Sequence, residues 1–333
     1  MRARPILAAA LLFLLAGCDT LAYYRQAIGG HLQVMRAARP VAEWLADPAT
    51  PPELRERLET SQRIREFAWR SLGLPRNDSY TSYAEIGRPF VVWNVFAAPA
   101  LSVDPRLECF AFAGCVGYRG FFSEEAARSH AAELKAAGYD VHVGGVTAYS
   151  TLGWFDDPLL SSFIRTPDSQ LARLIFHELA HQLVYAKNDT AFNESFAVVV
   201  EEEGVRRWLQ SRARGEDLER FRAAQARRRE FAARIKQARS RLDQIYKSSL
   251  SKEAMLEQKR GEFDRLRASY GDAVPAEPSN AFLLAVALYN ELVPGFERLL
   301  AENGGSLEKF YTRVRELAAT ERSSRDPLPA RSP

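Results

Sequence analysis

Hydrophobic residues recur at helical spacing along the chain between residues 19 and 75. Residues 23–45 carry apolar side chains at that spacing, and residues 51–74 open with two prolines that suit a first helical turn. The second stretch has one apolar stripe, made of Leu54, Leu58, Ile64, Phe67 and Leu72. The pattern predicts helices whose apolar face packs on a core.

The pattern changes between residues 76 and 150. Residues 90–103 and 109–122 are rich in Val, Phe, Tyr and Trp and are broken by Pro and Gly, which favours strands. A helix is predicted after Ser123, which can cap it, and it ends at Gly138 before a further strand at residues 139–145. Strands in the midst of helices predict an α+β fold, mainly helical with a small mixed sheet.

The next helix is apolar on nearly every face. Thr166 can cap it, Pro167 suits its first position, and Asp168 favours the positive end of the helix dipole. It ends at residues 187–189, and another helix opens near Thr190. A helix with almost no polar face is expected to be buried.

An antiparallel helical hairpin is predicted as an insertion over residues 210–270, approximately. Apolar residues follow three- and four-residue steps in a first arm and again in a return arm, which is a coiled-coil pattern. They are Leu218, Phe221, Phe231, Ile235, Ala238, Leu242 and Ile245, then Leu256, Phe263, Leu266 and Tyr270. Two more helices follow at residues 280–300 and 306–318. The polar residues 323–333 predict a disordered tail.

Composition and charge narrow the class of protein. The chain has 333 residues, of which 47% are hydrophobic and 26% charged, as in globular proteins. The net charge of +3 is too small to indicate a nucleic-acid partner. Residues 205–270 are nevertheless basic, with 19 Lys or Arg against 9 Asp or Glu. The simplest interpretation of this positive charge is a solvated coiled-coil face, and contact with anionic lipid headgroups is the alternative. A protein partner for the hairpin also stays open.

The first residues have the pattern of an export signal. Two arginines precede an apolar run over residues 6–15, too short to span a membrane as a mature helix. The run ends in Leu-Ala-Gly-Cys18, which resembles the lipobox of bacterial lipoproteins. That resemblance implies a signal peptide of residues 1–17, lipidation of Cys18, and a lipoprotein anchored on the periplasmic side. Asp19 weakly favours the inner membrane. An ordinary secreted protein with a chance cysteine is the alternative.

Cys109 and Cys115 have five residues between them. Outside the cytoplasm a close pair favours a disulfide, with two buried small hydrophobic residues as the alternative. A metal role is not expected because no CxxC or Cys/His spacing accompanies them.

The buried helix contains an HExxH motif, His177-Glu178-Leu179-Ala180-His181. Residues four apart on a helix share one face, so both imidazoles can reach one metal ion. Glu178 lies about 100° round the helix, where it can reach a water molecule at the metal. Zn²⁺ suits nitrogen ligands and can bring the pKa of a bound water to about 7. The alternative is two hydrogen-bonded core histidines with Glu178 directed outward.

A catalytic zinc needs a third protein ligand. His31, His130 and His142 lie in no ligand motif. Glu194, thirteen residues after His181 at the start of the next helix, is the better candidate, although a glutamate there can simply complement the helix dipole. Glu201 and the adjacent Glu202 and Glu203 are rival ligands. Glu201, seven residues after Glu194 and on the same helix face, can instead orient a ligand histidine.

Several stretches together resemble a family of bacterial lipoproteins described as predicted aminopeptidases, and more distantly the gluzincin metallopeptidases. They are "VVWNVFAAPALS", "GCVGYRGFF", "YDVHVGGVTAYSTLGWFDDPLL", "FHELAHQLVYAKNDTAFNESFA" and "YNELVPGFERLL". The resemblance implies a zincin-like metallopeptidase domain over residues 18–322, a peptide substrate, His177, His181 and Glu194 as zinc ligands, and Glu178 as general base. Val198 stands where thermolysin-like enzymes have an acidic residue that steadies a ligand histidine.

Two questions stay open at this point. Tyr149, Tyr185 and Tyr289 are candidates for the donor to a developing oxyanion, and each is otherwise a core tyrosine. The chain can also be a lipid-anchored scaffold that retains zinc without catalysis and acts through its helical hairpin.

Overall fold

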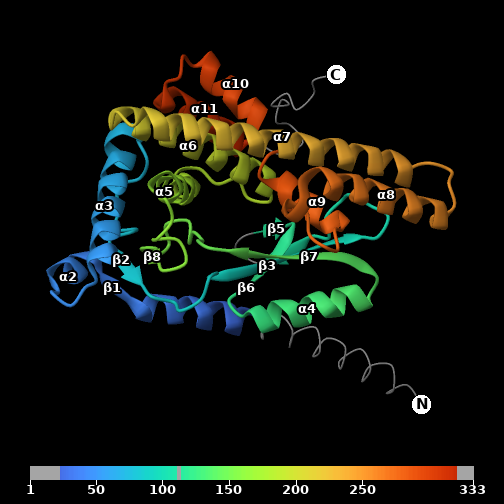
Figure 1. Cartoon of the computed structure of the whole chain (residues 1–333), viewed down its shortest axis with the longest axis horizontal. Coiled ribbons are helices and arrows are strands. Elements are labelled where there is room, and N and C mark those ends of the chain that lie inside the picture. The colour runs from blue at the N-terminus through green and yellow to red at the C-terminus, as the bar shows by residue number, and fades with distance from the viewer. Residues whose placement is uncertain (1–22, 111–113, 321–333) are drawn as a thin grey trace.

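The computed structural model describes residues 23–110 and 114–320 (Figure 1). The expected signal peptide, Cys18 and the expected tail at residues 323–333 lie outside the described residues. Residues 23–37 form a helix, followed by α2 (Val41–Ala46) and α3 (Pro52–Leu72). α3 has the predicted proline start and ends at Gly73, whose φ of 67° lies in the left-handed region that glycine adopts freely. Its predicted apolar stripe faces the core.

The sheet nearest the candidate site is antiparallel. β3 (Val92–Pro99) lies between β6 (Tyr118–Phe121) and β7 (Tyr139–Val146). Because side chains alternate along a strand, β3 presents Trp93, Val95 and Ala97 to α4 (Glu124–Ala136), and its other face lies toward α9 (Asn280–Leu288) (Figure 1). β7 is an edge strand among the described residues, and the chain after it continues toward the candidate site.

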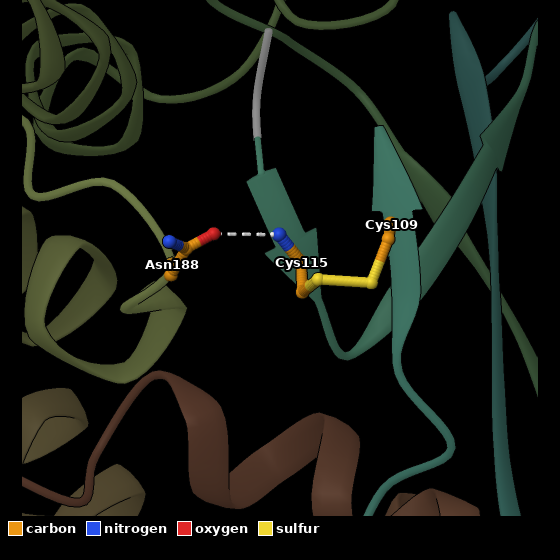
Figure 2. The surroundings of a disulfide bond; sticks show 3 residues. All are labelled: Cys109, Cys115 and Asn188. Atoms are coloured by element: carbon orange, nitrogen blue, oxygen red, sulfur yellow. Dashed lines mark hydrogen bonds between the residues drawn. A yellow bond between two sulfur atoms is a disulfide. The ribbon is translucent and has the colours of Figure 1, made fainter. Parts of the chain in front are cut away.

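The other strands form two smaller sheets. β2 (Ser82–Ala84) pairs antiparallel with β1 (Ala38–Pro40) and parallel with β8 (Leu159–Leu160), which makes a small mixed sheet. β4 (Glu108–Phe110) and β5 (Gly114–Val116) form a hairpin. Cys109 and Cys115 form a disulfide across this hairpin, and the backbone N–H of Cys115 donates to Asn188 Oδ1 at 2.8 Å (Figure 2). The hairpin is thereby held against the segment that follows the HExxH helix.

Two long helices carry the candidate chemistry, α5 (Asp168–Leu183) and α6 (Thr190–Ser211). The expected cap of α5 is wrong: the hydroxyl of Thr166 donates to the Phe163 carbonyl, and Pro167 occupies the N-cap without a side-chain bond. Asp168 instead anchors the first turn through an ion pair with Arg57 at 2.6 Å. α6 is capped by Asp189, which accepts from the Phe192 N–H. The two helices pack against each other along much of their length.

The predicted hairpin consists of α7 (Gly215–Tyr246) and α8 (Lys252–Tyr270). The start of α7 belongs to the main core, where Leu218 and Phe221 are buried. Farther along, Ile235, Ala238 and Leu242 pack against α8 and against α9, so the stripe is filled within the chain. The 3-10 turn η1 (Gly271–Ala273), α10 (Val293–Glu302) and α11 (Leu307–Ala319) complete an α+β fold that is mainly helical. None of the described helices combines the length and the apolar character that crossing a membrane requires.

Candidate metal centre

The HExxH segment lies in the middle of α5, one helical turn between its two histidines. The Nε2 atoms of His177 and His181 are 3.2 Å apart, and both residues are 8% exposed. The neighbouring positions Phe176 and Leu179 are buried in the core, which fixes the rotation of the helix about its axis. Both imidazoles therefore point toward the same place.

Glu194 reaches that place from the N-terminal part of α6, just after its first turn. Its Oε2 atom is 3.2 Å from His177 Nε2 and 3.7 Å from His181 Nε2. The connection between the helices is held by Asn193, whose side chain bonds both the N–H and the C=O of Ala186 at 2.7 and 2.8 Å. Ligand atoms of the two histidines and Glu194 lie within 4.8 Å of one another, an arrangement that could hold a metal ion.

Glu201 supports the first histidine from two turns farther along α6. Its Oε2 accepts from His177 Nδ1 at 2.9 Å, and its Oε1 accepts from Arg173 Nη1 at 2.9 Å. This bond leaves His177 Nε2 directed at Glu194, the usual arrangement for a metal-binding histidine. The steadying role that Val198 cannot perform is thus taken by Glu201, and Glu201 does not join the group of ligand atoms.

The carboxylates of the centre are stabilised by positive charge, as the pKa values of His177 and Glu194 show. Burial lowers the pKa of His177, but hydrogen bonds with Glu194 and Glu201 outweigh burial and raise this pKa to about 10. Burial raises the pKa of Glu194, but the charge of His181 and hydrogen bonds with both histidines outweigh it and hold the pKa at about 2. A divalent cation would supply this charge and use the lone pairs that neutral imidazoles keep free. The donor set therefore fits a metal ion.

Glu178 lies beside the three ligand residues but does not bond to them. It is 8% exposed, and it makes no hydrogen bond or ion pair within the part of the chain that the structure describes. Burial raises its pKa, helped by the charges of Glu194 and Glu201 and opposed by the two histidines. A buried carboxyl group without a partner, with a raised pKa, is suited to accept and release a proton.

A cavity of about 610 Å³ opens onto the centre. All three tyrosines considered from the sequence line it, as does Tyr118, which sequence reasoning missed because a tyrosine in an aromatic-rich strand is typical of a core. The ring of Tyr289 lies near the proposed ligands, with its centroid 6.3 Å from that of His177. Tyr149 bonds to His31 at 2.8 Å.

The remaining histidines stay apart from the ligand group. His31 lines the cavity from the helix of residues 23–37 and packs against Tyr149 and Phe155. His142 packs between Phe96 and Phe282, and His130 lies against Phe121. Only the helical register of residues 23–37 could have indicated His31, and that register does not reveal which element the helix faces.

Comparison with known proteins gives one match. A family model described as "Putative aminopeptidase" matches residues 22–328, which is most of the chain and includes all the residues of the candidate centre. No curated protein and no solved structure shows significant similarity. Since the match extends over far more than half of the sequence, the chain belongs to the putative aminopeptidase family.

Proposed function

We propose that the protein is a zinc-dependent peptidase, an aminopeptidase in class, with Glu178 as general base and acid. The observation that carries the proposal is the buried group of His177, His181 and Glu194 with an unbonded carboxyl group next to it. The family to which the chain belongs supports peptide hydrolysis. A zincin-like arrangement is also supported by the second cavity, which residues of the edge strand β7 line together with residues of α5 and α6.

Two imidazole nitrogens and one carboxylate oxygen are donors that suit zinc and leave room for a fourth ligand. When bound, zinc would act as a Lewis acid on a substrate carbonyl and increase the acidity of water. Glu201 and Arg173 would keep His177 in the orientation that this requires.

The chain's own groups would move the proton. Glu178 accepts a proton from the water that attacks the carbonyl carbon, and it then delivers that proton to the nitrogen of the leaving amine as the C–N bond breaks. Of the three candidate tyrosines, Tyr289, whose ring lies 6.3 Å from that of His177, is our choice of donor to the developing oxyanion. The charge of Glu194 and burial raise the pKa of Tyr289 well above its usual value, so its hydroxyl stays protonated and able to donate.

We also propose that the mature chain is anchored through lipid at Cys18 and acts on the periplasmic side of the membrane. Support for the anchor comes from the sequence around Cys18. The alternative, a scaffold that binds a partner through the helical hairpin, is less favoured. The apolar stripe of α7 packs against α8 and α9. The buried residues of this stripe are therefore not available to bind a partner.

The test compares the purified protein with Glu178→Gln. The proposal expects both to bind about one zinc per chain, and expects turnover of unblocked peptides to fall at least ~10²-fold in the variant. Glu203→Gln, whose side chain pairs with Arg206 and Arg207 on the far side of α6, is the matched control and should keep full activity. Equal turnover in all three proteins, or no zinc in the unaltered protein, contradicts the proposal. Peptides with a blocked and a free α-amine then separate endopeptidase from aminopeptidase action.

A further inference from the structure

A second cavity, of about 400 Å³, lies next to the metal centre. It shares His177, Glu178 and Tyr289 with the larger cavity, and it extends toward the N-terminal half of α5, where Arg173 and Leu174 line it. The two cavities therefore meet at the proposed reaction site. A peptide cleaved beside Glu178 would place its two halves in the two cavities.

The second cavity is lined by three arginines and, apart from Glu178, two glutamates. Arg173 pairs with Glu201 at 2.9 Å, and Arg229 pairs with Glu202 at 2.7 Å. These two pairs use both glutamates. Arg228 remains, and it makes no hydrogen bond or ion pair with any residue of the described ranges 23–110 and 114–320.

Arg228 lines the second cavity, and its guanidinium carbon lies 5.9 Å from the centroid of the Phe221 ring, with no carboxylate bonded to it among the described residues. Its Nη2 atom is buried and has no hydrogen-bond partner. A buried donor without an acceptor costs free energy, and a guanidinium keeps its charge, so the position favours a ligand that brings a negative oxygen. A carboxylate is the planar anion that matches the paired N–H groups of arginine.

The edge strand indicates which end of a peptide would enter this cavity. Residues 145–148, at the end of β7 and just after it, line the second cavity, called the arginine cavity from here on for Arg173, Arg228 and Arg229. Val146 and residues 148–152 line the larger cavity, which therefore extends farther along the chain after β7. An extended peptide can pair with the free edge of a strand, and antiparallel pairing is the slightly more stable choice. An antiparallel peptide would run from the larger cavity to the arginine cavity, with its C-terminal end beside Arg228.

Among the described residues, the larger cavity has no carboxylate for a substrate amine apart from those of the proposed reaction site. Among the described residues that line it, the carboxylates are Glu178 and Glu194, and the proposed reaction uses both. The α-amine that an aminopeptidase accepts would therefore meet Glu178, Glu194 or uncharged acceptors, whereas the second cavity offers an additional charged side chain, Arg228, to the C-terminal end of the substrate.

We propose that the arginine cavity is a subsite for the C-terminal carboxylate of a short peptide and that Arg228 determines this specificity. The inference rests on the proposed peptidase function and names its substrate class. It also gives α7 a role in the site, because Arg228 and Arg229 both come from the first half of the hairpin.

The kinetic test uses four short peptides, with a free C-terminal carboxylate or a C-terminal amide, each with and without an acidic side chain after the scissile bond. The unaltered protein should prefer the free acids by about 10- to 100-fold in kcat/KM. Arg228→Gln should remove that preference mainly through KM, leave the amides within about twofold, and be partly rescued in Arg228→Lys. Arg227→Gln, the adjacent exposed arginine outside the cavity, is the control. Equal cleavage of acids and amides, or a preference that follows the acidic side chain alone, overturns the proposal.

A binding measurement separates this inference from peptidase activity. N-acetyl-alanyl-alanine and its C-terminal amide are titrated calorimetrically into the Glu178→Gln protein, with and without Arg228→Gln. Weaker binding of the acid by about 10-fold in the double variant supports the subsite even if no peptide is hydrolysed. Identical binding of acid and amide overturns the subsite even if the protein proves to be a peptidase. Circular dichroism spectra that match between variants establish that the comparison is between folded proteins.

Discussion

Replacing Glu201 by glutamine should weaken metal binding although Glu201 is not a ligand. Glu201 is 2% exposed, and each of its oxygens accepts one bond, from His177 Nδ1 and from Arg173 Nη1, both at 2.9 Å. Burial raises the pKa of Glu201, but the charge of Arg173 and the bond from His177 outweigh burial and lower it, so the group is a carboxylate. Glutamine keeps the size and has one acceptor oxygen, so one of the two donors loses its partner.

The expected size of the effect follows from that lost bond. A hydrogen bond to a charged group contributes about 1.5–3 kcal/mol, and loss of a residue that orients a metal ligand lowers affinity about 10- to 100-fold, or about 1.4–2.8 kcal/mol. The two ranges agree, because the bond between His177 Nδ1 and Glu201 is the one that keeps His177 Nε2 directed at Glu194. Some of the loss will be seen as lower stability of the metal-free protein, since the glutamine would be buried.

Competition with a chromophoric chelator at pH 7.5 gives the zinc dissociation constant, and urea unfolding of the metal-free protein gives the change in stability. Glu203→Gln on the same helix is the control, because its arginine partners Arg206 and Arg207 do not contact a ligand. If the zinc affinity of Glu201→Gln stays within twofold of that of the unaltered protein, His177 is oriented by packing alone, and Glu201 does not have the orienting role.

Two further predictions concern stability. Burial raises the pKa of Asp157 from 3.8 to about 6, so the charged form of Asp157 is disfavoured in the folded protein. The resulting loss in the free energy of unfolding grows as the pH rises from about 4 to 6 and reaches about 3 kcal/mol. Asp157→Asn should therefore stabilise the protein against urea at pH 7.5 and change little at pH 4, and an equal difference at both pH values would contradict this. Gly204 in α6 approaches α5 and α3 so closely that a Cβ would lie 2.7 Å from Phe176 Cδ2 and 2.8 Å from Leu72 Cδ1. Gly204→Ala should lower the free energy of unfolding by about 1–3 kcal/mol despite the ~1 kcal/mol helix preference of alanine, and a more stable variant would contradict the crowding.

The parts of the centre that sequence could predict are those within reach of one helix and one turn. His177, Glu178 and His181 follow from helical periodicity, and Glu194 follows from the shortness of the connection to the next helix. Glu201 stayed undecided between ligand and support, because a seven-residue spacing gives the face of α6 and not the distance to His177. The expected cap at Thr166 failed because its hydroxyl has a competing local acceptor, the Phe163 carbonyl.

Residues that arrive from distant elements could not be predicted in the same way. His31 comes from the first helix, Tyr118 from β6, and Arg228 from the helical hairpin, each separated from the HExxH motif by at least 47 residues, from His181 to Arg228. The apolar stripe of α7 indicated correctly that this helix packs on other helices. It did not indicate that the start of α7 packs on the main core, or that Arg228 and Arg229 line a cavity together with α5. Which polar face meets the site depends on tertiary packing, which periodicity does not contain.

The close packing of α5 on α6 links stability to the metal centre. α6 supplies Glu194 to the metal side of His177 and Glu201 to its other nitrogen, so both contacts change together if α6 moves relative to α5. Gly204 lies less than one turn beyond Glu201, and a Cβ at this position would lie 2.7 Å from Phe176, the residue before His177. A side chain at position 204 would push the two helices apart at that point, and both bonds to His177 would lengthen. Crowding there should therefore weaken zinc binding as well as stability, whereas Asp157→Asn should change stability alone.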